Sequence, residues 1–279
     1  MKTMLIGDIG STKAQWAWLS RDREVTFETI GFNPVMHDPE LLSEMLTQVQ
    51  DRCRDDFTEM YYYGTGIISD TTRKQVIDTL RKVFGKVEIS CESDMLGAAR
   101  ALSAGKEGVI CILGTGSNSC LFDGKIITRQ IPSLGFPLGD EGSGADIGKA
   151  CVRAFYYGFM TDEVRTSFAE MLPDDRSFFL YQYHQHKTPN RFLAGLVPLV
   201  VKHLDSALIQ AILEERFRTF TRLHVKPYQA SFPVHFTGGV AHAFGDVLQD
   251  ILRDEKLIPG TIVKSPLSGL IEFHQNNQA

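Results

Sequence analysis

A strand, loop and strand pattern occurs twice in this chain, and it constrains the fold more than any other feature. In the first copy, Leu5-Ile-Gly-Asp-Ile-Gly-Ser-Thr runs into the apolar stretch Gln15-Trp-Ala-Trp-Leu. In the second copy, Cys111-Ile-Leu-Gly-Thr-Gly-Ser-Asn runs into Ser119-Cys-Leu-Phe. Short apolar runs on both sides of a Gly-containing loop predict a β-hairpin. Because the pattern is repeated, we expect a chain made of two related halves.

Strands and helices are expected to alternate after each hairpin, which favours an α/β fold. The predicted elements of the first half are a strand at 61–63, a helix capped by Asp70 and running to about Val83, a strand at 86–91 and a helix at 96–102. Those of the second half are helices at 148–159, 191–203, 207–223 and 244–252 and a strand at 234–236.

The chain has 279 residues, which is enough for two domains. The polar, Gly-bearing segment 103–108 is the best candidate for their boundary. We therefore expect an N-terminal domain at 1–105 and a C-terminal domain at 106–263. The tail, 264–279, contains a short predicted helix at 266–276 that could pack back on the first domain.

Composition excludes several classes of partner. The formal net charge is -5, and basic residues are scattered among acidic ones, so neither nucleic acid nor an anionic membrane is an expected partner. No apolar run approaches a membrane span or a signal peptide, which predicts a cytoplasmic protein. The five cysteines lack metal-ligand spacing and are interpreted as reduced core thiols.

The two hairpin loops are candidate phosphate sites. Successive backbone N–H groups in a Gly-rich turn can bind phosphate oxygens, because glycine lets the ligand approach closely. The first loop adds Asp8, a candidate Mg²⁺ ligand, and the donors Thr12 and Lys13. Either loop alone could be only a tight hairpin, but the repetition favours nucleotide binding. Neither loop matches a P-loop or a Rossmann fingerprint, so these classes are excluded.

A third Gly-rich segment, Thr237-Gly-Gly-Val-Ala241, lies between the strand at 234–236 and the helix at 244–252. Gly238 and Gly239 could let a flat group such as adenine lie against the backbone. By itself the segment could equally be a simple strand-to-helix turn.

In this order, the three motifs resemble those of the actin, hexokinase and heat-shock ATPase superfamily. The resemblance extends from Leu5 to about Leu252 and is closest to the BadF/BadG/BcrA/BcrD ATPase family, in particular its N-acetylglucosamine kinase-like branch. It implies two ribonuclease-H-like domains with ATP and Mg²⁺ in the cleft between them. The implied nucleotide-binding residues are Asp8 (also the metal ligand), Gly10, Ser11, Thr12, Lys13, Gly114, Thr115, Gly116, Gly238 and Gly239.

The resemblance also implies a sugar site. Asp94, in Cys91-Glu-Ser-Asp, matches the base that takes the proton of the sugar hydroxyl, although it could instead be only a helix cap. Asp140, in Leu138-Gly-Asp-Glu-Gly-Ser-Gly144, matches a ligand of sugar hydroxyls, with a solvated turn as the alternative. The remaining implied sugar-binding residues are Ser117, Asn118 and Asn33, of which Asn33 could also be an ordinary turn residue before Pro34.

The sequence departs from the kinase pattern at Ser133-Leu-Gly-Phe136, where the kinases have a Gly-Trp-Gly-like stretch. The resemblance favours phosphorylation of an amino sugar, most simply N-acetylglucosamine at its 6-hydroxyl. Because this departure changes the shape of the implied sugar pocket, N-acetylmuramic acid or another hexose are alternative acceptors. The family often dimerises, so a homodimer is a possible assembly.

Three other functions are alternatives. An activator ATPase of the 2-hydroxyacyl-CoA dehydratase type needs cysteines for an iron–sulfur cluster, and Cys151 is the only cysteine after the second loop. A non-catalytic sugar or ATP sensor usually carries a DNA-binding segment, for which a first strand beginning by Leu5 leaves no room, but a regulator that acts on protein partners stays an alternative. An ATP hydrolase without a small-molecule acceptor is the third alternative.

Overall fold

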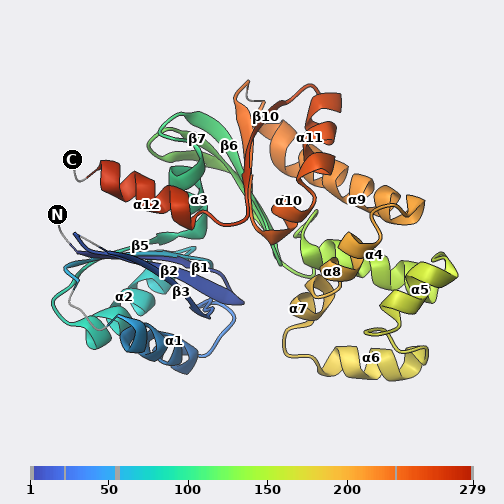
Figure 1. Ribbon diagram of the computed structural model, residues 1–279, viewed down its shortest axis with the longest axis horizontal. Coiled ribbons are helices and arrows are strands. Elements are labelled where there is room, and N and C mark those ends of the chain that lie inside the picture. The colour runs from blue at the N-terminus through green and yellow to red at the C-terminus, as the bar shows by residue number, and fades with distance from the viewer. Residues whose placement is uncertain (1–2, 22, 54–56, 230, 278–279) are drawn as a thin grey trace. The chain divides into compact units, whose positions relative to one another are not determined.

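The computed structural model describes residues 3–21, 23–53, 57–229 and 231–277. The chain divides into two compact units, each of which contains a β-sheet and helices (Figure 1). The first unit comprises Met1–Lys106, Gly124–Ile127 and Ser265–Ala279, and the second comprises Glu107–Asp123 and Thr128–Lys264.

The sheet of the first unit has five strands in the order β3-β2-β1-β4-β5. Strands β1, β2 and β3 are antiparallel neighbours, whereas β4 and β5 continue from β1 in parallel. The strands are β1 (Met4–Ile9), β2 (Lys13–Leu19), β3 (Glu24–Ile30), β4 (Glu59–Gly64) and β5 (Glu88–Ser93). The helices are α1 (Pro39–Arg52), α2 (Asp70–Phe84), α3 (Asp94–Leu102) and α12 (Leu267–Asn276).

Strand β1 lies at the centre of this sheet and is apolar on both faces. Leu5 and Ile9 belong to a core that includes residues of α1 and α2, while Met4 and Ile6 belong to a second core that includes residues of α12. A strand covered on both faces is expected to be a nearly continuous apolar run. The only charged residue of β1, Asp8, is therefore out of place as a core residue and needs another explanation.

The second unit repeats this topology. Its sheet has the order β10-β9-β6-β7-β8, with β6 and β7 antiparallel and β9 parallel to both β6 and β10. The strands are β6 (Glu107–Leu113), β7 (Ser117–Asp123), β8 (Ile127–Gln130), β9 (Pro233–Thr237) and β10 (Ile258–Val263). Each of the two sequence patterns forms the central hairpin of its sheet, so the prediction of two hairpins and two related halves is confirmed.

The second unit contains more helices than the first. They are α4 (Gly144–Tyr156), α5 (Asp162–Phe168), α6 (Arg176–Gln185), α7 (Pro189–Ala194), α8 (Val197–Lys202), α9 (Ala207–Phe220), α10 (Gly239–Ala243) and α11 (Gly245–Asp254). In the described ranges, no helix combines the length and the apolar composition that crossing a membrane requires.

Three details of the predicted helices were wrong. The expected helix at 191–203 is two helices, because Pro198 cannot donate a backbone hydrogen bond and its ring excludes the carbonyl four residues earlier. The helix expected to run to 223 is α-helical only to Phe220 and continues as a π-helical turn over Thr221–Val225. The cap of α2 is Ser69 and not Asp70. The extended backbone of Ser69 lets its side chain accept the N–H of Thr72.

The C-terminal helix α12 packs closely on α3 within the first unit. A Cβ atom on Gly269 would lie 2.4 Å from the carbonyl oxygen of Ala101, so only glycine permits this approach. At the far end of α12, His274 Nε2 lies 2.9 Å from the Tyr63 hydroxyl, which also accepts a hydrogen bond from Arg100 of α3. These contacts fix α3 against the sheet.

Replacing Gly269 with alanine should therefore destabilise the protein. The added methyl group would collide with backbone atoms, which cannot move aside cheaply, and we expect the free energy of unfolding to fall by about 1–3 kcal/mol. Gly245→Ala is the matched control, because a Cβ there would meet only Ile262 side-chain atoms at 3.8 Å. Denaturant unfolding of the two variants measures the difference, and equal stability would contradict this account of the α12–α3 contact.

Candidate active site

The first hairpin loop is closed by its own backbone. Gly10 N–H donates to the Lys13 carbonyl at 3.0 Å, and Gly31 N–H, just after β3, donates to the Thr12 carbonyl at 3.1 Å. These bonds leave Ser11 and Thr12 at the tip of the loop. The turn is therefore held rigidly from below by β3 while its tip faces outward.

Lys13 begins β2 and forms an ion pair with Glu28 of β3, with 3.1 Å between Nζ and Oε1. Both side chains are 56% exposed. An exposed pair of this kind contributes at most about 1 kcal/mol, so the ammonium group could exchange Glu28 for a phosphate at little cost.

Asp8 lies near the end of β1, half-buried, immediately before this loop. Burial raises the pKa of its carboxyl from 3.8 to about 7, the negative charge of Asp94 adds to the rise, and Lys13 opposes it. Ionising Asp8 in the folded protein is therefore costly unless another positive charge is present.

Asp94 is the first residue of α3, directly after β5. The helix cap is Ser93, whose hydroxyl accepts the N–H of Leu96 at 3.2 Å, so Asp94 is not needed as the cap. Its carboxylate accepts the Met95 N–H at 2.8 Å and a hydrogen bond from Thr65. Burial raises the pKa of Asp94, although these two hydrogen bonds lower it.

Asp8 fits a divalent cation. Carboxylate oxygens are the ligands that Mg²⁺ prefers, and a cation would offset the burial of Asp8 and its repulsion from Asp94. Across the described part of the chain, no group of three or more His, Cys, Asp or Glu side chains is arranged to hold a metal. Mg²⁺ would thus be held by Asp8 together with water and phosphate oxygens, as in many nucleotide sites.

The second hairpin loop is held by the start of α4. Gly114 N–H donates to the Gly116 carbonyl at 2.9 Å, which closes the loop. Gly144 and Ala145 at the N-terminus of α4 donate to the carbonyls of Gly114 and Thr115, at 2.8 and 3.2 Å. The positive end of the α4 dipole therefore lies against this loop, which favours an anion there.

Asp140 lies beside the second loop and is only 8% exposed. Its Oδ1 accepts the Ser117 N–H at 3.1 Å and the Ser133 hydroxyl at 3.4 Å. Burial raises the pKa of Asp140, and these two bonds oppose the rise. The Ser117 hydroxyl is buried without a hydrogen-bond partner among the described residues, as expected of a donor kept for a ligand.

Thr237 ends β9, and Gly238 and Gly239 lead into α10 beside β6, the strand that enters the second loop. Gly238 N–H donates to the Val263 carbonyl at 3.2 Å, and its Cα lies against the carbonyl of Leu113. A Cβ on Gly239 would have no atom within 4 Å, so this backbone is open to a ligand. The Thr237 hydroxyl is another buried group without a partner among the described residues.

The two predicted asparagines are engaged in local hydrogen bonds. Asn33 Oδ1 accepts the Val35 N–H at 2.9 Å, which is the turn interaction expected before proline. Asn118 Oδ1 accepts the Ser119 N–H at 2.9 Å and a bond from Gln130 at 3.1 Å. A role in sugar binding would therefore fall to their amide Nδ2 groups.

Within the first unit, the fold thus brings Asp8 and Asp94 close enough to interact electrostatically. Asn33 lies beside Gly66, the residue after Thr65, which bonds Asp94. Within the second unit, it brings Asp140 to Ser117. Sequence reasoning missed two residues that hold these carboxylates, Thr65 and Ser133. Thr65 follows β4 at the same edge of the sheet as Asp8, where ligand sites of parallel strands gather, and could have been found on that ground. Ser133 had no such signal.

Asp8→Asn should stabilise the metal-free protein at high pH. An acid whose pKa is raised on folding makes the folded state lose stability as pH rises from about 4 to about 7. At pH 8 we expect the variant to be more stable than the wild type by roughly 2–4 kcal/mol, and at pH 4 to be similar. Denaturant unfolding in the presence of a chelator measures this. A difference that is the same at both pH values would contradict it.

Comparisons with known proteins agree with this geometry. The model of the BadF/BadG/BcrA/BcrD ATPase family matches residues 7–270. A solved structure from Porphyromonas gingivalis, described as a "putative N-acetylglucosamine kinase", is 34% identical, covers 99% of this chain and 100% of its own, and superposes with a TM-score of 0.92. No curated protein is significantly similar in sequence.

More distant structures share the fold. A Chromobacterium violaceum protein with the same description is 17% identical, with a TM-score of 0.75 and coverage of 98% of this chain and 99% of its own. A Streptomyces griseus ROK family glucokinase, solved with glucose and AMPPNP, is 12% identical, with a TM-score of 0.60 and coverage of 99% and 100%. The two sheets of equal topology thus form the two-domain actin-like fold, and the chain belongs to the BadF/BadG/BcrA/BcrD ATPase family.

Proposed function

We propose that this protein is an ATP-dependent sugar kinase that transfers the γ-phosphoryl group of ATP to a hydroxyl of an amino sugar. The proposed acceptor hydroxyl is the 6-hydroxyl. N-acetylglucosamine is the proposed acceptor, and the cytoplasm, with its ATP pool, is the proposed location. The observation that carries the proposal is that Asp8, near the end of β1, and Asp94, directly after the parallel strand β5, lie at the same edge of the first sheet and interact electrostatically. The similarity to the P. gingivalis protein supports the choice of acceptor.

Asp94 is the proposed general base. It is half-buried and held by Thr65 and the Met95 N–H, so its carboxylate has a defined direction. It would take the proton of the sugar hydroxyl as the oxygen attacks the γ-phosphorus and the bond to the bridging β–γ oxygen breaks, releasing ADP. Phosphoryl transfer has a loose transition state, so Asp94 chiefly orients the hydroxyl and accepts the proton late.

The Gly-rich loops are the proposed phosphate sites. In the first unit, the proposed donors to an anion are those of Ser11 and Thr12. In the second unit, they are those of the backbone of Gly114–Gly116, which the start of α4 holds. Gly238 and Gly239, where a Cβ on Gly239 would meet no atom within 4 Å, are the proposed contact for the adenosine of the nucleotide. Mg²⁺, held through Asp8, would neutralise charge on the β- and γ-phosphates.

Asp140 is the proposed ligand of sugar hydroxyls. Two serine donors already hold one of its oxygens, and the buried Ser117 hydroxyl beside it has capacity for a ligand. Because one carboxylate oxygen can accept from two adjacent hydroxyls, this group suits a hexose. The loop beginning at Ser133 differs from the kinase pattern, so N-acetylmuramic acid or another hexose is the alternative acceptor.

The structure opposes the activator-ATPase alternative. Cys151 is fully buried in the core of the second unit, and burial raises the pKa of its thiol to about 12. A buried, protonated thiol is a poor ligand for an iron–sulfur cluster shared between subunits. A sensor without turnover would bind the same ligands, and only an activity measurement separates it from a kinase.

Asp94→Asn should abolish most of the transfer while leaving ATP binding intact. We expect sugar-dependent ADP release to fall by about 10²–10⁴-fold because the base is lost. The measurement is ADP release with Mg-ATP across N-acetylglucosamine, N-acetylmuramic acid, glucosamine and glucose. Asp70→Asn is the matched control, because Asp70 is likewise the first residue of a helix capped by serine. Wild-type turnover in Asp94→Asn would remove the assignment, and ADP release that no sugar stimulates would contradict the kinase proposal.

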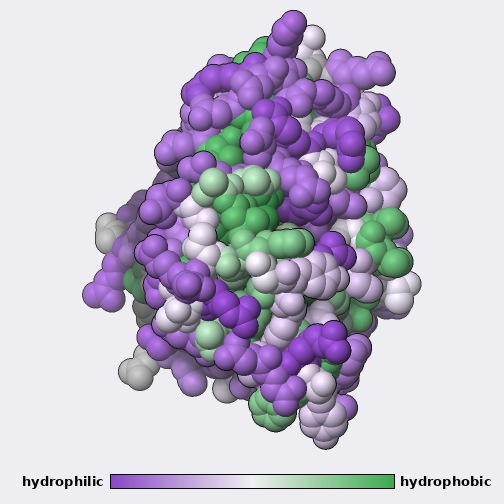
Figure 2. Space-filling view, turned by 90° about the vertical axis from the view of Figure 1, so that its right-hand side faces the viewer, coloured by the Kyte–Doolittle hydropathy of each residue, from purple (hydrophilic) through white to green (hydrophobic). Residues whose placement is uncertain are grey.

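We also propose a homodimer formed through the second unit. Large apolar side chains are exposed at the end of α4 and along α6, namely Tyr157, Phe159, Phe178 and Tyr181. The two elements are in contact through Tyr156 and Phe179. Figure 2 shows one face of the molecule, on which hydrophobic residues form a patch. Light scattering should give twice the 31.2 kDa chain mass for the wild type and a lower mass for Tyr181→Asp. A monomeric wild type would contradict this assembly.

A further inference from the structure

Asp140 has an unusual backbone conformation for a residue other than glycine. Its φ is +65°, in the left-handed region, and Gly142, two residues later, has a φ of +71°. Aspartate tolerates this region better than most residues, but a non-glycine residue stays there only when its surroundings hold it. The contacts that hold this loop therefore determine where the Asp140 carboxylate points.

The loop is attached to α9 and the π-helical turn that follows it. A Cβ on Gly142 would lie 2.9 Å from Cβ of Phe220, the last residue of α9, so the loop lies directly on this side chain. Gly142 N–H donates to Asp146 at 3.1 Å. Between these contacts and Asp140, Glu141 Oε2 lies 3.0 Å from Nε2 of His224, a residue of the π-helical turn.

His224 is built into the interior rather than placed on the surface. It is 6% exposed, and its ring stacks on Phe220 with centroids 5.2 Å apart and an interplanar angle of 17°. Burial alone would raise the pKa of Glu141, but bonds to its own backbone N–H and to His224 lower it overall, so Glu141 is an ionised acceptor. His224 Nε2 must therefore be the donor, because a carboxylate can only accept.

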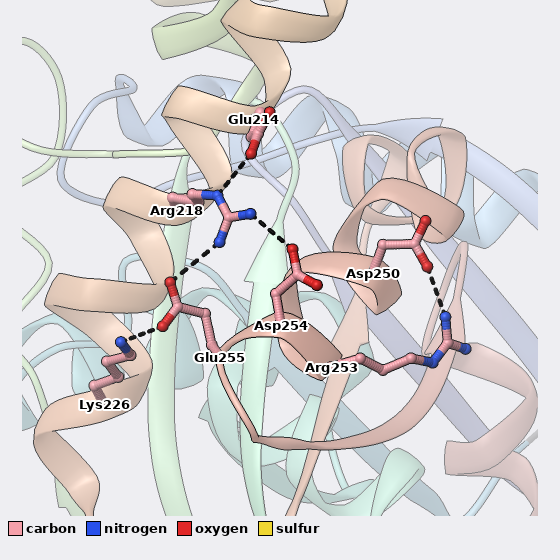
Figure 3. A network of polar contacts seen from close by, with 7 residues as sticks. All are labelled: Glu214, Arg218, Lys226, Asp250, Arg253, Asp254 and Glu255. Carbon is pink, nitrogen blue, oxygen red and sulfur yellow. Dashed lines mark hydrogen bonds and ion pairs between the residues drawn. The ribbon is translucent and has the colours of Figure 1, made fainter.

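The π-helical turn is in turn held at both of its ends by one carboxylate. Glu255, just after α11, accepts from Arg218 before the turn at 3.2 Å and from Lys226 after it. Arg218 also bonds Glu214 at 2.9 Å and Asp254 at 2.8 Å (Figure 3). π-helical turns are rare and occur often at functional sites, where they displace a side chain from the face an α-helix would give it. Here the displaced side chains include His224.

We propose that Glu141 and His224 are positioning residues that hold Asp140 in its left-handed conformation and thereby set the affinity for the sugar acceptor. The inference rests on the proposed function, in which Asp140 binds the sugar. His224 does not touch the sugar or the nucleotide in this account. Its effect should consequently appear in the KM of the acceptor, with little change in kcat or in the KM of ATP.

The test compares His224→Phe, His224→Gln and His203→Phe in steady-state ADP release with N-acetylglucosamine. Phenylalanine keeps the ring that stacks on Phe220 but removes the donor, and we expect the acceptor KM to rise by about tenfold or more. Glutamine restores an N–H donor, so its KM should stay within about threefold of the wild type. His203 is an equally buried histidine bonded to Ser167 at 2.8 Å, away from this loop, and His203→Phe controls for general destabilisation.

A double-mutant cycle and amide exchange complete the test. If the two residues act through one bond, Glu141→Ala combined with His224→Phe should be no worse than the more severe single variant. In the free protein, His224→Phe should speed exchange at Ser117 N–H and Gly142 N–H, while His203→Phe should not. Equal effects of the two phenylalanine variants, an additive cycle, or unchanged exchange would each overturn the positioning role.

Failure of the proposed function would look different. It would appear as a wild-type protein whose ADP release does not depend on any sugar, and it would remove the link to acceptor affinity. Exchange at Ser117 and Gly142 would still report whether His224 holds the Asp140 loop.

Discussion

Two carboxylates that repel one another, Asp8 and Asp94, are the constraint on which the rest of the first unit depends. Asp8 is the one charged residue in a central strand covered on both faces, and Asp94 begins the helix that follows the edge strand of the parallel pair. Burial disfavours the ionised form of both carboxyls, and the charge of Asp94 adds to the cost of ionising Asp8. A cation bound at Asp8 would offset the cost of ionising that carboxyl and leave Asp94 available for another role.

The surrounding contacts keep α3, and with it Asp94, from moving away. Gly269 of α12 approaches the backbone of Ala101, and Gly97 of α3 packs on Tyr63, which His274 and Arg100 bond from two sides. The second unit has the same strand topology but different residues around its central hairpin loop. The start of α4 holds this loop, and Asp140 lies beside it. Repetition of one strand topology thus gives two hairpin loops with different chemistry around them.

The parts of this structure that the sequence predicted are those encoded locally. Both hairpins follow from apolar runs around Gly-rich loops, and α12 follows from its own apolar spacing. The break between α7 and α8 is also encoded locally, because Pro198 disfavours a continuous helix. The prediction missed it because the apolar spacing continues through the break. The π-helical turn after Phe220 has no comparable signal, because it depends on Glu255, a residue far along the chain.

The same division applies to the candidate site. Asp8, Asp94 and Asp140 were identified from motifs and a family resemblance, and their chemical roles stay predictions. Their supports, Thr65, Ser133 and the Glu141–His224 pair, depend on which strands and helices meet in space and could not be read from neighbouring residues. The helix cap shows the limit at short range: Ser93 and Asp94 are both good capping residues, and only the structure shows that the serine has that role.

Calorimetric titration of the full chain with ATP, with and without Mg²⁺, tests the central claim most directly. If Asp8 binds a cation that also contacts phosphate, one ATP should bind per chain in the presence of Mg²⁺, and removal of the ion should weaken binding by about tenfold or more. Binding of equal strength in the presence of a chelator, or two independent sites per chain, would contradict the claim.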